Sequence, residues 1–199
     1  LEHYGFISDC QSGALVGSDG STDWLCLPRF DSPACFAALL GTSEHGRWQV
    51  RPAGDGWSVR QQYRGETMIL ETEFSNADGA VKIIDFMSLR STVADVVRIV
   101  QGVRGTVPMQ MQLTVRSDYG VVVPWVTRTP TGLRAIAGPD LWRLRTDVPI
   151  ESENFETHAE FSIKEGQRVF FDLTWSQSHV DEPGPLGVGQ GLEDTERFW

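Results

Sequence analysis

The chain has 199 residues, of which 40% are hydrophobic and 22% are charged, and its formal net charge is -10 at pH 7. This length and composition suit one large domain or two small ones with a buried core. The negative charge argues against a nucleic acid partner, because phosphates require a basic surface. No apolar run approaches the roughly 18 residues that cross a bilayer, so we expect no membrane partner either.

The first residues, LEHYGFISDC, lack the basic start and apolar core of a secretory signal. The three cysteines, Cys10, Cys26 and Cys35, form no C-x-x-C pair. We therefore expect buried thiols rather than a zinc site or a disulfide framework. These features favour a cytoplasmic protein.

The N-terminal part of the chain predicts a β-hairpin. Ser12–Val16 and Thr22–Leu27 flank the turn Gly17-Ser18-Asp19-Gly20, in which Gly and Asp tolerate a positive φ. Both faces of the second strand are apolar, which predicts a strand inside a sandwich with Trp24 in the core.

A short helix is expected after this hairpin, near residues 33–40. Pro28 ends the strand, because proline has no N–H for a ladder. Ser32 and Pro33 are typical of an N-cap and a first helical position, and Gly41 of a helix stop, which predicts a helix over Ala34–Leu40.

From Arg47 onward the hydrophobic pattern has period two. The cleanest example is Val107–Arg116, in which apolar side chains alternate with Gln, Thr and Arg, as in a strand with one solvated face. Further strands are expected at Trp48–Val50, Trp57–Tyr63, Met68–Phe74, Ala80–Phe86, Asp95–Arg104, Val121–Arg128, Leu133–Ala137, Leu141–Thr146, Phe155–Ile163 and Val169–Trp175. About thirteen short strands with almost no helical periodicity predict an all-β fold, a large antiparallel β-sandwich.

The last residues change in character. Asp181–Gly191 is rich in Gly and Pro and has no periodicity, which predicts a linker. Leu192–Trp199 is expected to form the start of a helix. The predicted organisation is therefore a β-sandwich domain over 1–180, followed by a linker and the start of a linker helix over 181–199.

The sequence contains no concentrated catalytic signal. His3, His45, His158 and His179 are far apart and none has a partner at metal-ligand spacing, and no nucleophile elbow, P-loop or dinucleotide fingerprint is present. We therefore expect no metal site and no cofactor.

Three carboxylates could carry chemistry or structure. Glu71 and Glu73 share one face of a predicted strand, where solvation of that face is the expected role. Asp85, between Ile84 and Phe86, suits either a strand end, where it would cap backbone N–H groups, or the lining of a cleft, and the structural role is favoured.

Arg29, Phe30 and Asp31 are the candidate substrate-contact residues. Asp31 could bond amides of the following helical turn and Arg29 could pair with it, which are structural roles. An aromatic ring beside charged hydrogen-bonding groups is also what a sugar site uses, so both alternatives stay open. Sugar-stacking platforms are likewise possible at Trp57, Trp125 and Trp142.

The chain resembles the start of bacterial glycoside hydrolase family 15 proteins, which include glucoamylase-like enzymes and trehalases. The resemblance covers essentially all 199 residues. It is carried by Glu2-His3-Tyr4, Ile7–Cys10, Ala14–Val16, Asp19–Ser32, Leu70–Phe74, Ile84–Met87, Val97–Val100 and Ala137–Asp140.

This resemblance implies a fold and a role. In that family the segment is an N-terminal β-supersandwich, similar to galactose mutarotase, which a linker helix joins to an (α/α)6 barrel carrying the catalytic glutamates of an inverting mechanism. We therefore expect no catalytic residue in this chain, a same-chain barrel as its partner, and α-glucosides as candidate ligands. The alternatives are an independent carbohydrate-binding module and an aldose mutarotase-like enzyme.

Overall fold

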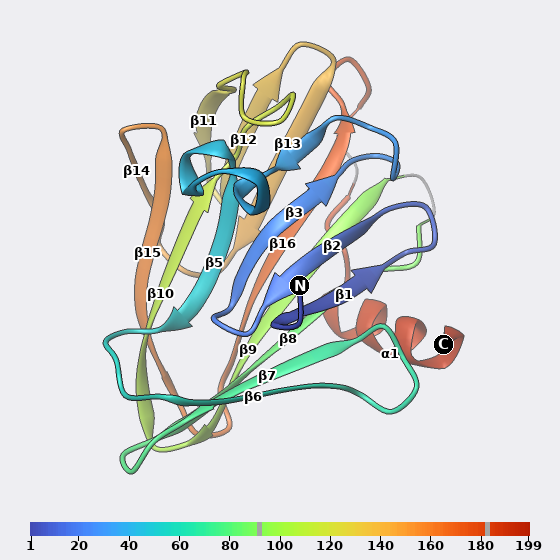
Figure 1. Cartoon of the computed structure of the whole chain (residues 1–199). Helices are drawn as coiled ribbons and strands as arrows, with labels where there is room; N and C mark the ends of the chain where they lie inside the picture. The colour runs from blue at the N-terminus through green and yellow to red at the C-terminus, as the bar shows by residue number, and fades with distance from the viewer. Residues whose placement is uncertain (91–92, 182–183) are drawn as a thin grey trace.

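The computed structural model describes residues 1–90, 93–181 and 184–199, and it shows an all-β antiparallel sandwich with one C-terminal α-helix (Figure 1). The first sheet contains, in order, β1 (Tyr4–Ser8), β2 (Gly13–Gly17), β3 (Ser21–Cys26), β5 (Arg47–Pro52), β10 (Thr106–Thr114), β15 (Glu156–Lys164) and β14 (Glu151–Glu153), with β4 (Ala34–Phe36) paired to β3. The second sheet contains β11 (Trp125–Thr129), β12 (Gly132–Ala137), β13 (Asp140–Thr146), β16 (Arg168–Gln177), β9 (Ala94–Arg104), β8 (Ala80–Met87), β7 (Leu70–Ser75) and β6 (Ser58–Tyr63). The predicted fold class is confirmed.

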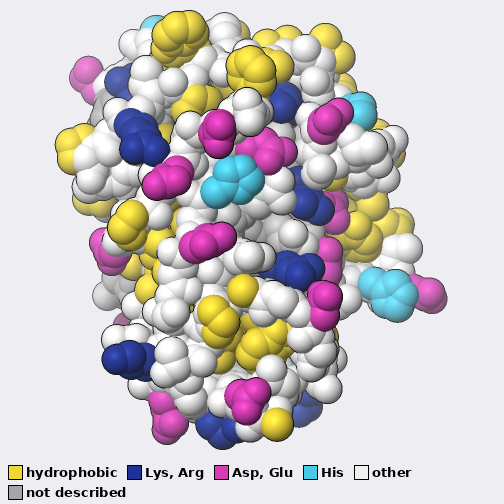
Figure 2. Space-filling view, turned by 90° about the vertical axis from the view of Figure 1, so that its left-hand side faces the viewer, with side chains coloured by type: hydrophobic (Ala, Val, Ile, Leu, Met, Phe, Trp, Pro, Cys, Tyr) yellow, Lys and Arg dark blue, Asp and Glu magenta, His cyan; other side chains and the backbone are white. Residues whose placement is uncertain are grey.

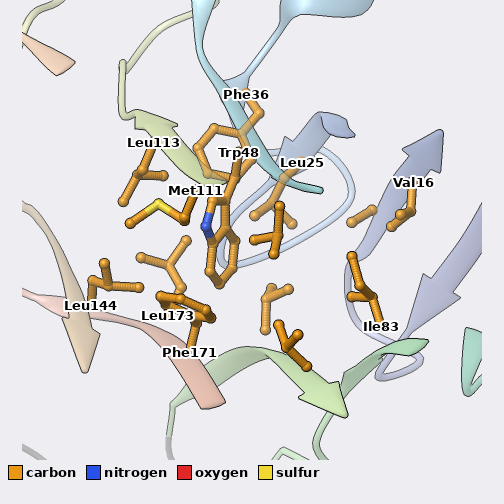
Figure 3. Close-up of a cluster of buried hydrophobic side chains, with 14 of the residues drawn as sticks. Val16, Leu25, Phe36, Trp48, Ile83, Met111, Leu113, Leu144, Phe171 and Leu173 are labelled. Carbon is orange, nitrogen blue, oxygen red and sulfur yellow. The ribbon is translucent and has the colours of Figure 1, made fainter. Parts of the chain in front are cut away.

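The main core fills the space between the two sheets (Figure 3). Trp48 of β5 lies at its centre, with Met111 and Leu113 of β10 on one side and Phe171 and Leu173 of β16 below. The predicted alternation holds from Val107 to Leu113, where the apolar side chains are buried and Gln110 and Gln112 are not. Thr114 and Arg116, predicted on the solvated face, are instead buried. Strand registers of this kind are specified by burial, since a slip of one residue would turn every apolar side chain toward water.

The predicted first hairpin is confirmed, and its turn depends on Gly20. This residue has a φ of 79°, and an added Cβ would lie 2.1 Å from the carbonyl oxygen of Val50. A side chain at Gly20 would therefore be strained and would push β3 away from β5.

The predicted helix over Ala34–Leu40 is wrong. Ala34–Phe36 forms strand β4, which pairs with β3, and only Ala38–Leu40 forms one turn of 3-10 helix, η1; a second turn, η2, covers Ser43–His45. The Ser32 hydroxyl accepts a hydrogen bond from the Arg29 N–H and caps no helix. Pairing with β3 buries Ala34 and Phe36 completely, and this tertiary burial outweighs the local helix signals.

The C-terminal helix α1 covers Val188–Phe198 and begins earlier than the predicted Leu192. It packs Leu192, together with Leu186 and Val188, on an apolar patch of the outer face of the second sheet. That patch consists of Ile69, Ile84, Phe86, Val97 and Ile99. Burial of Val188 and Leu192 on one helix face explains why the Gly-rich residues before Leu192 are helical. Glu182 and Pro183 of the predicted linker lie outside the described residues.

Candidate functional site

Arg29, Phe30 and Asp31 form an exposed corner between β3 and β4. The Arg29 guanidinium donates two hydrogen bonds to the Asp31 carboxylate, at 2.8 and 3.0 Å. Their side chains are 69% and 71% exposed. Phe30 stacks on Phe6 with a centroid separation of 6.5 Å and an interplanar angle of 21°. The structure thus brings all three candidates together, and Asp31 pairs with Arg29 instead of capping a helix.

A buried ion pair between Arg90 and Asp9 holds the backbone next to this corner. The Arg90 guanidinium lies 2.6 Å from the carboxylate of Asp9, whose side chain is fully buried, and it also donates to the Pro28 carbonyl. Asp9 in turn accepts hydrogen bonds from the N–H groups of Gln11 and Ser12. The backbone before the corner contains a cis peptide bond between Leu27 and Pro28. Asp9 and Arg90 carried no signal in the sequence, because 81 residues separate them.

A large apolar surface lies at the same end of the molecule as the corner. We call it the upper apolar surface. It comprises the exposed side chains Leu40, Tyr119, Val121, Val122, Val123, Trp125, Val126 and Phe155. Val121 and Trp125 are 77% and 76% exposed. Figure 2 shows hydrophobic side chains gathered at this upper end.

The upper apolar surface is built on ordered backbone. The Tyr119 N–H donates to the Ala34 carbonyl of β4, and Ser117 and Val122 exchange backbone hydrogen bonds. The Tyr119 ring lies 6.1 Å from that of Trp24. β4, which follows the corner in the chain, is linked to this surface through the hydrogen bond from Tyr119 to Ala34. Monomeric soluble proteins rarely expose apolar patches of this kind without a partner.

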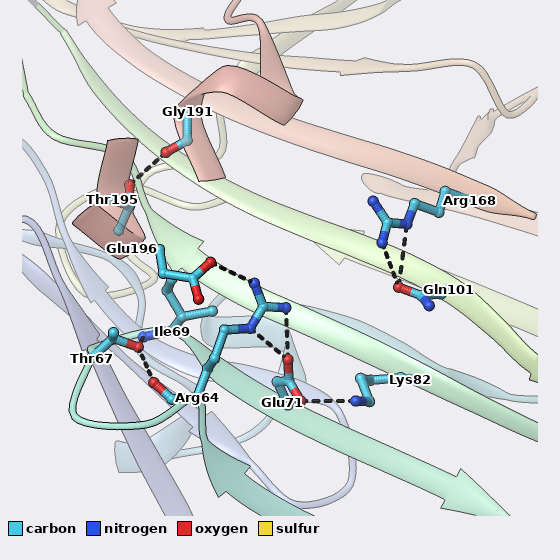
Figure 4. Close-up of polar contacts among 10 residues, drawn as sticks. All are labelled: Arg64, Thr67, Ile69, Glu71, Lys82, Gln101, Arg168, Gly191, Thr195 and Glu196. Carbon is cyan, nitrogen blue, oxygen red and sulfur yellow. Dashed lines mark hydrogen bonds and ion pairs between the residues drawn. The ribbon is translucent and has the colours of Figure 1, made fainter. Parts of the chain in front are cut away.

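Glu71 of β7 has a structural role (Figure 4). Glu71 is buried between Arg64, at 2.6 Å, and Lys82, at 2.9 Å, so the expectation that it merely solvates a strand face is wrong. Burial alone would raise the pKa of Glu71, but the hydrogen bonds from Lys82 and Arg64 outweigh it and the pKa is lowered. Arg64 also reaches Glu196 of α1 at 3.3 Å, which ties the helix to the sheet. Asp85 lies within β8 and is buried against Arg98, so its role is structural, but it forms an ion pair instead of the predicted cap on backbone N–H groups.

Two further carboxyl groups with shifted pKa values were missed in the sequence. Asp95 and Asp172 lie buried on the outer side of the second sheet. Burial raises the pKa of Asp172 to about 7, with a further rise from the neighbouring Asp95 and an opposing effect of Arg145. Burial also raises the pKa of Asp95, although Thr174 and Ser88 donate hydrogen bonds to it.

The remaining sequence candidates separate into buried and exposed groups. Cys26 and Cys35 are buried, and burial raises the pKa of both thiols, whereas Cys10 is exposed, contrary to the prediction. Trp142 is buried and cannot form a sugar-stacking platform, while Trp125 is exposed. Trp24, predicted in the core, is only partly buried and packs at the edge of a small cluster.

Neither a metal-binding cluster nor a membrane-spanning helix is present in residues 1–90, 93–181 and 184–199. In these ranges no group of three or more His, Cys, Asp or Glu side chains is placed to hold a metal ion. None of the helices in the described part of the chain is long and apolar enough to span a membrane.

Comparison with known proteins identifies the family. Residues 1–186 match the family model described as "Trehalase-like, N-terminal". The chain belongs to this trehalase-like N-terminal family. The match confirms the resemblance to the start of glycoside hydrolase family 15 proteins.

Several trehalases are relatives of this domain. It is 32% identical to the trehalase of Mycolicibacterium smegmatis, over 89% of this chain and 30% of that protein. It is 31% identical to trehalase 1 of Sulfolobus acidocaldarius, over 76% of this chain and 26% of that protein. It is 27% identical to the trehalase of Thermoplasma volcanium, over 100% of this chain and 33% of that protein. The chain thus spans about a third of the length of these relatives.

A solved structure also aligns with this domain. A putative kojibiose phosphorylase from the human microbiome aligns over 97% of this chain and 32% of that chain, with a TM-score of 0.40 and 8% identity. The assignment of an antiparallel sandwich rests on the strand pairing itself.

Proposed function

We propose that this chain is the non-catalytic N-terminal domain of an inverting α-glucoside hydrolase of the trehalase or glucoamylase type. In this proposal it docks on a C-terminal (α/α)6 catalytic barrel of the same polypeptide and stabilises it, in the cytoplasm. The relatives named above are trehalases about three times as long as the matched region, which supports a further domain as partner.

The upper apolar surface is the observation that carries the docking proposal. Its exposed rings and aliphatic side chains, Trp125 and Phe155 among them, are the residue types that dominate protein interfaces. The corner at the same end of the molecule, with Arg29 and Asp31, supplies a charged rim. An apolar centre with a polar rim is the usual anatomy of a stable interface.

Replacing Val121 and Trp125 together with serine tests the docking role. The change is made in a chimaera in which residues 1–186 replace the matching region of the Mycolicibacterium smegmatis trehalase. We expect the chimaera to lose about 2–4 kcal/mol of stability, because a buried tryptophan anchor is lost, with a lower thermal midpoint of trehalose hydrolysis. The isolated chain should change by less than about 0.5 kcal/mol.

Val103→Ser, at an exposed position near the C-terminal end of β9, is the matched control and should leave the stability of the chimaera unaltered. Equal effects of the two changes would contradict docking through the upper apolar surface. Hydrolysis of trehalose or maltose by the pure 199-residue chain would contradict the non-catalytic assignment.

We further propose that the Arg29–Asp31 corner contacts the substrate end of the barrel. Asp31→Ala in the same chimaera should lower kcat/KM for trehalose about 10-fold to 100-fold, the effect of losing one charged hydrogen bond. Folding should be intact, because an exposed ion pair contributes at most about 1 kcal/mol. Asp78→Ala, in the exposed β7–β8 turn, is the control. If turnover by Asp31→Ala matches the control, the corner is only structural.

A further inference from the structure

Two hollows lie beside the first sheet: one of about 220 Å³ on its outward side, and one of about 170 Å³ at the edge of the sandwich, where Val59 and Phe74 of the second sheet also line it. The smaller is lined by the loop after β5, with Trp57 and Asp55, and by Asp19 of the β2–β3 turn. The larger is lined by Gln49, Gln110, Gln112, His158 and Glu160. Arg51 lines both hollows, and we call the two hollows together the groove.

The groove follows the strand register. Gln49, Gln112 and His158 are direct neighbours across β5, β10 and β15, and so are Arg51, Gln110 and Glu160 one pair of residues further along. Figure 2, which faces this side of the molecule, shows acidic, basic and histidine side chains interspersed below the hydrophobic upper end. Donors and acceptors are thus presented in rows on a rigid sheet.

Polar contacts hold Gln112 and His158 of the larger hollow in place. Gln112 accepts from Arg47 at 2.8 Å and donates to Glu156 at 3.0 Å. His158 lies 3.3 Å from the same Glu156 carboxylate. Such pre-organisation lowers the entropic cost of binding a ligand.

The smaller hollow is held in the same way. Gln49 donates to Asp19 at 3.1 Å, a contact that joins the two hollows. The Trp57 indole donates to the Ala53 carbonyl at 3.2 Å, which orients a partly buried ring in the wall of the hollow. Arg51 donates to the Gly54 carbonyl at 3.3 Å.

We propose that this groove is a binding site for a neutral oligosaccharide. An aromatic ring at one end, followed by amides, carboxylates and a guanidinium, matches the apolar faces and hydroxyl groups of linked hexoses. The carboxylates of Asp19, Asp55 and Glu160 outnumber the guanidinium of Arg51, which disfavours an anionic ligand.

This site does not depend on the proposed docking on a catalytic barrel, because the groove and the upper apolar surface share no residue. It would let the domain hold a saccharide chain whether or not a hydrolase domain follows. The Val121→Ser and Trp125→Ser change should therefore leave saccharide binding unaltered, so that either proposal can fail alone.

Titration of the isolated, 15N-labelled chain with maltotriose and with trehalose tests the site. We expect a dissociation constant of about 1 mM for maltotriose. The shifted signals should include the side-chain amides of Gln49, Gln110 and Gln112 and the indole N–H of Trp57. Arg51→Met and Gln112→Ala should each weaken binding about 10-fold or more.

Gln101→Ala is the matched control, because it removes an amide held by Arg168 on the other sheet (Figure 4). It should bind maltotriose as the unmodified chain does. The spectra of all variants report whether they fold. The proposal is overturned if saccharide shifts no groove signal, if folded Arg51→Met binds as tightly as the control, or if inorganic phosphate binds the groove more tightly than maltotriose.

Discussion

Replacing Arg98 with methionine is expected to lower the free energy of unfolding by about 3–5 kcal/mol, the usual cost of breaking a buried ion pair. The Arg98 side chain is fully buried between the sheets, where it donates two hydrogen bonds to Asp85 at 2.8 and 3.2 Å. It also donates to the carbonyls of Trp48 and Gly20 in the opposite sheet, at 2.7 and 2.8 Å. The variant would leave the Asp85 carboxylate buried without its partner. It would also remove one hydrogen bond from each carbonyl, although the Gly20 carbonyl still accepts one from the Val50 N–H at 3.0 Å.

Chemical denaturation of the isolated chain measures this loss. Arg104→Met, at the exposed end of the same strand, is the control and should cost less than about 1 kcal/mol. The double variant Arg98→Met, Asp85→Leu should recover part of the loss, because it removes the unpaired charge. A loss below about 1 kcal/mol for Arg98→Met alone would show that the hydrogen bonds of Arg98 contribute little to stability.

The second large effect is a dependence of stability on pH through Asp172. Its pKa is about 7 in the folded chain, against 3.8 for a free side chain, so the folded state binds more protons than the unfolded state between these values. Stability should therefore fall as pH rises from about 4 to about 7 and change little above that. A shift of this size corresponds to a loss on the order of 4 kcal/mol.

Asp172→Asn should remove most of this pH dependence, because the amide does not ionise. Unfolding free energies of the variant and the original chain, measured at pH 5 and pH 8, check the prediction. The variant should be the more stable of the two at pH 8. Asp78→Asn, at an exposed turn, is the control and should keep the original slope. An unchanged slope in Asp172→Asn would assign the pH dependence to other groups, Asp95 first among them.

Local sequence patterns correctly predicted the elements in which the hydrophobic periodicity of the sequence agrees with the burial in the folded chain. The β10 strand, the first hairpin with its Gly20 turn, and the class of fold all followed from alternation and turn chemistry. The same reasoning failed at Ala34–Phe36, where helix punctuation suggested a helix but pairing with β3 decided the structure. It also placed the start of α1 too late, because the outer face of the second sheet supplies the apolar partner of Val188.

The candidate site was predicted only in part. Arg29, Phe30 and Asp31 were recognised together, because they are consecutive in the sequence. Their support by Asp9 and Arg90, the exposure of Trp125, and the groove from Trp57 to His158 all depend on contacts between residues far apart in the chain. No local pattern encodes such contacts.

The sequence by itself determined the antiparallel sandwich and the family. The alternation of apolar and polar residues and the residue blocks typical of the family can both be read along the chain. Only the tertiary structure decided which polar residues are buried. Asp172 alternates with Phe171 and Leu173, a pattern that would place it on a solvated face, yet it lies buried on the outer side of the second sheet. Arg98 lies in an apolar strand and is enclosed because carbonyls of the opposite sheet accept its hydrogen bonds. Burial of a charge depends on partners brought together by folding, and the order of residues along one strand does not contain them.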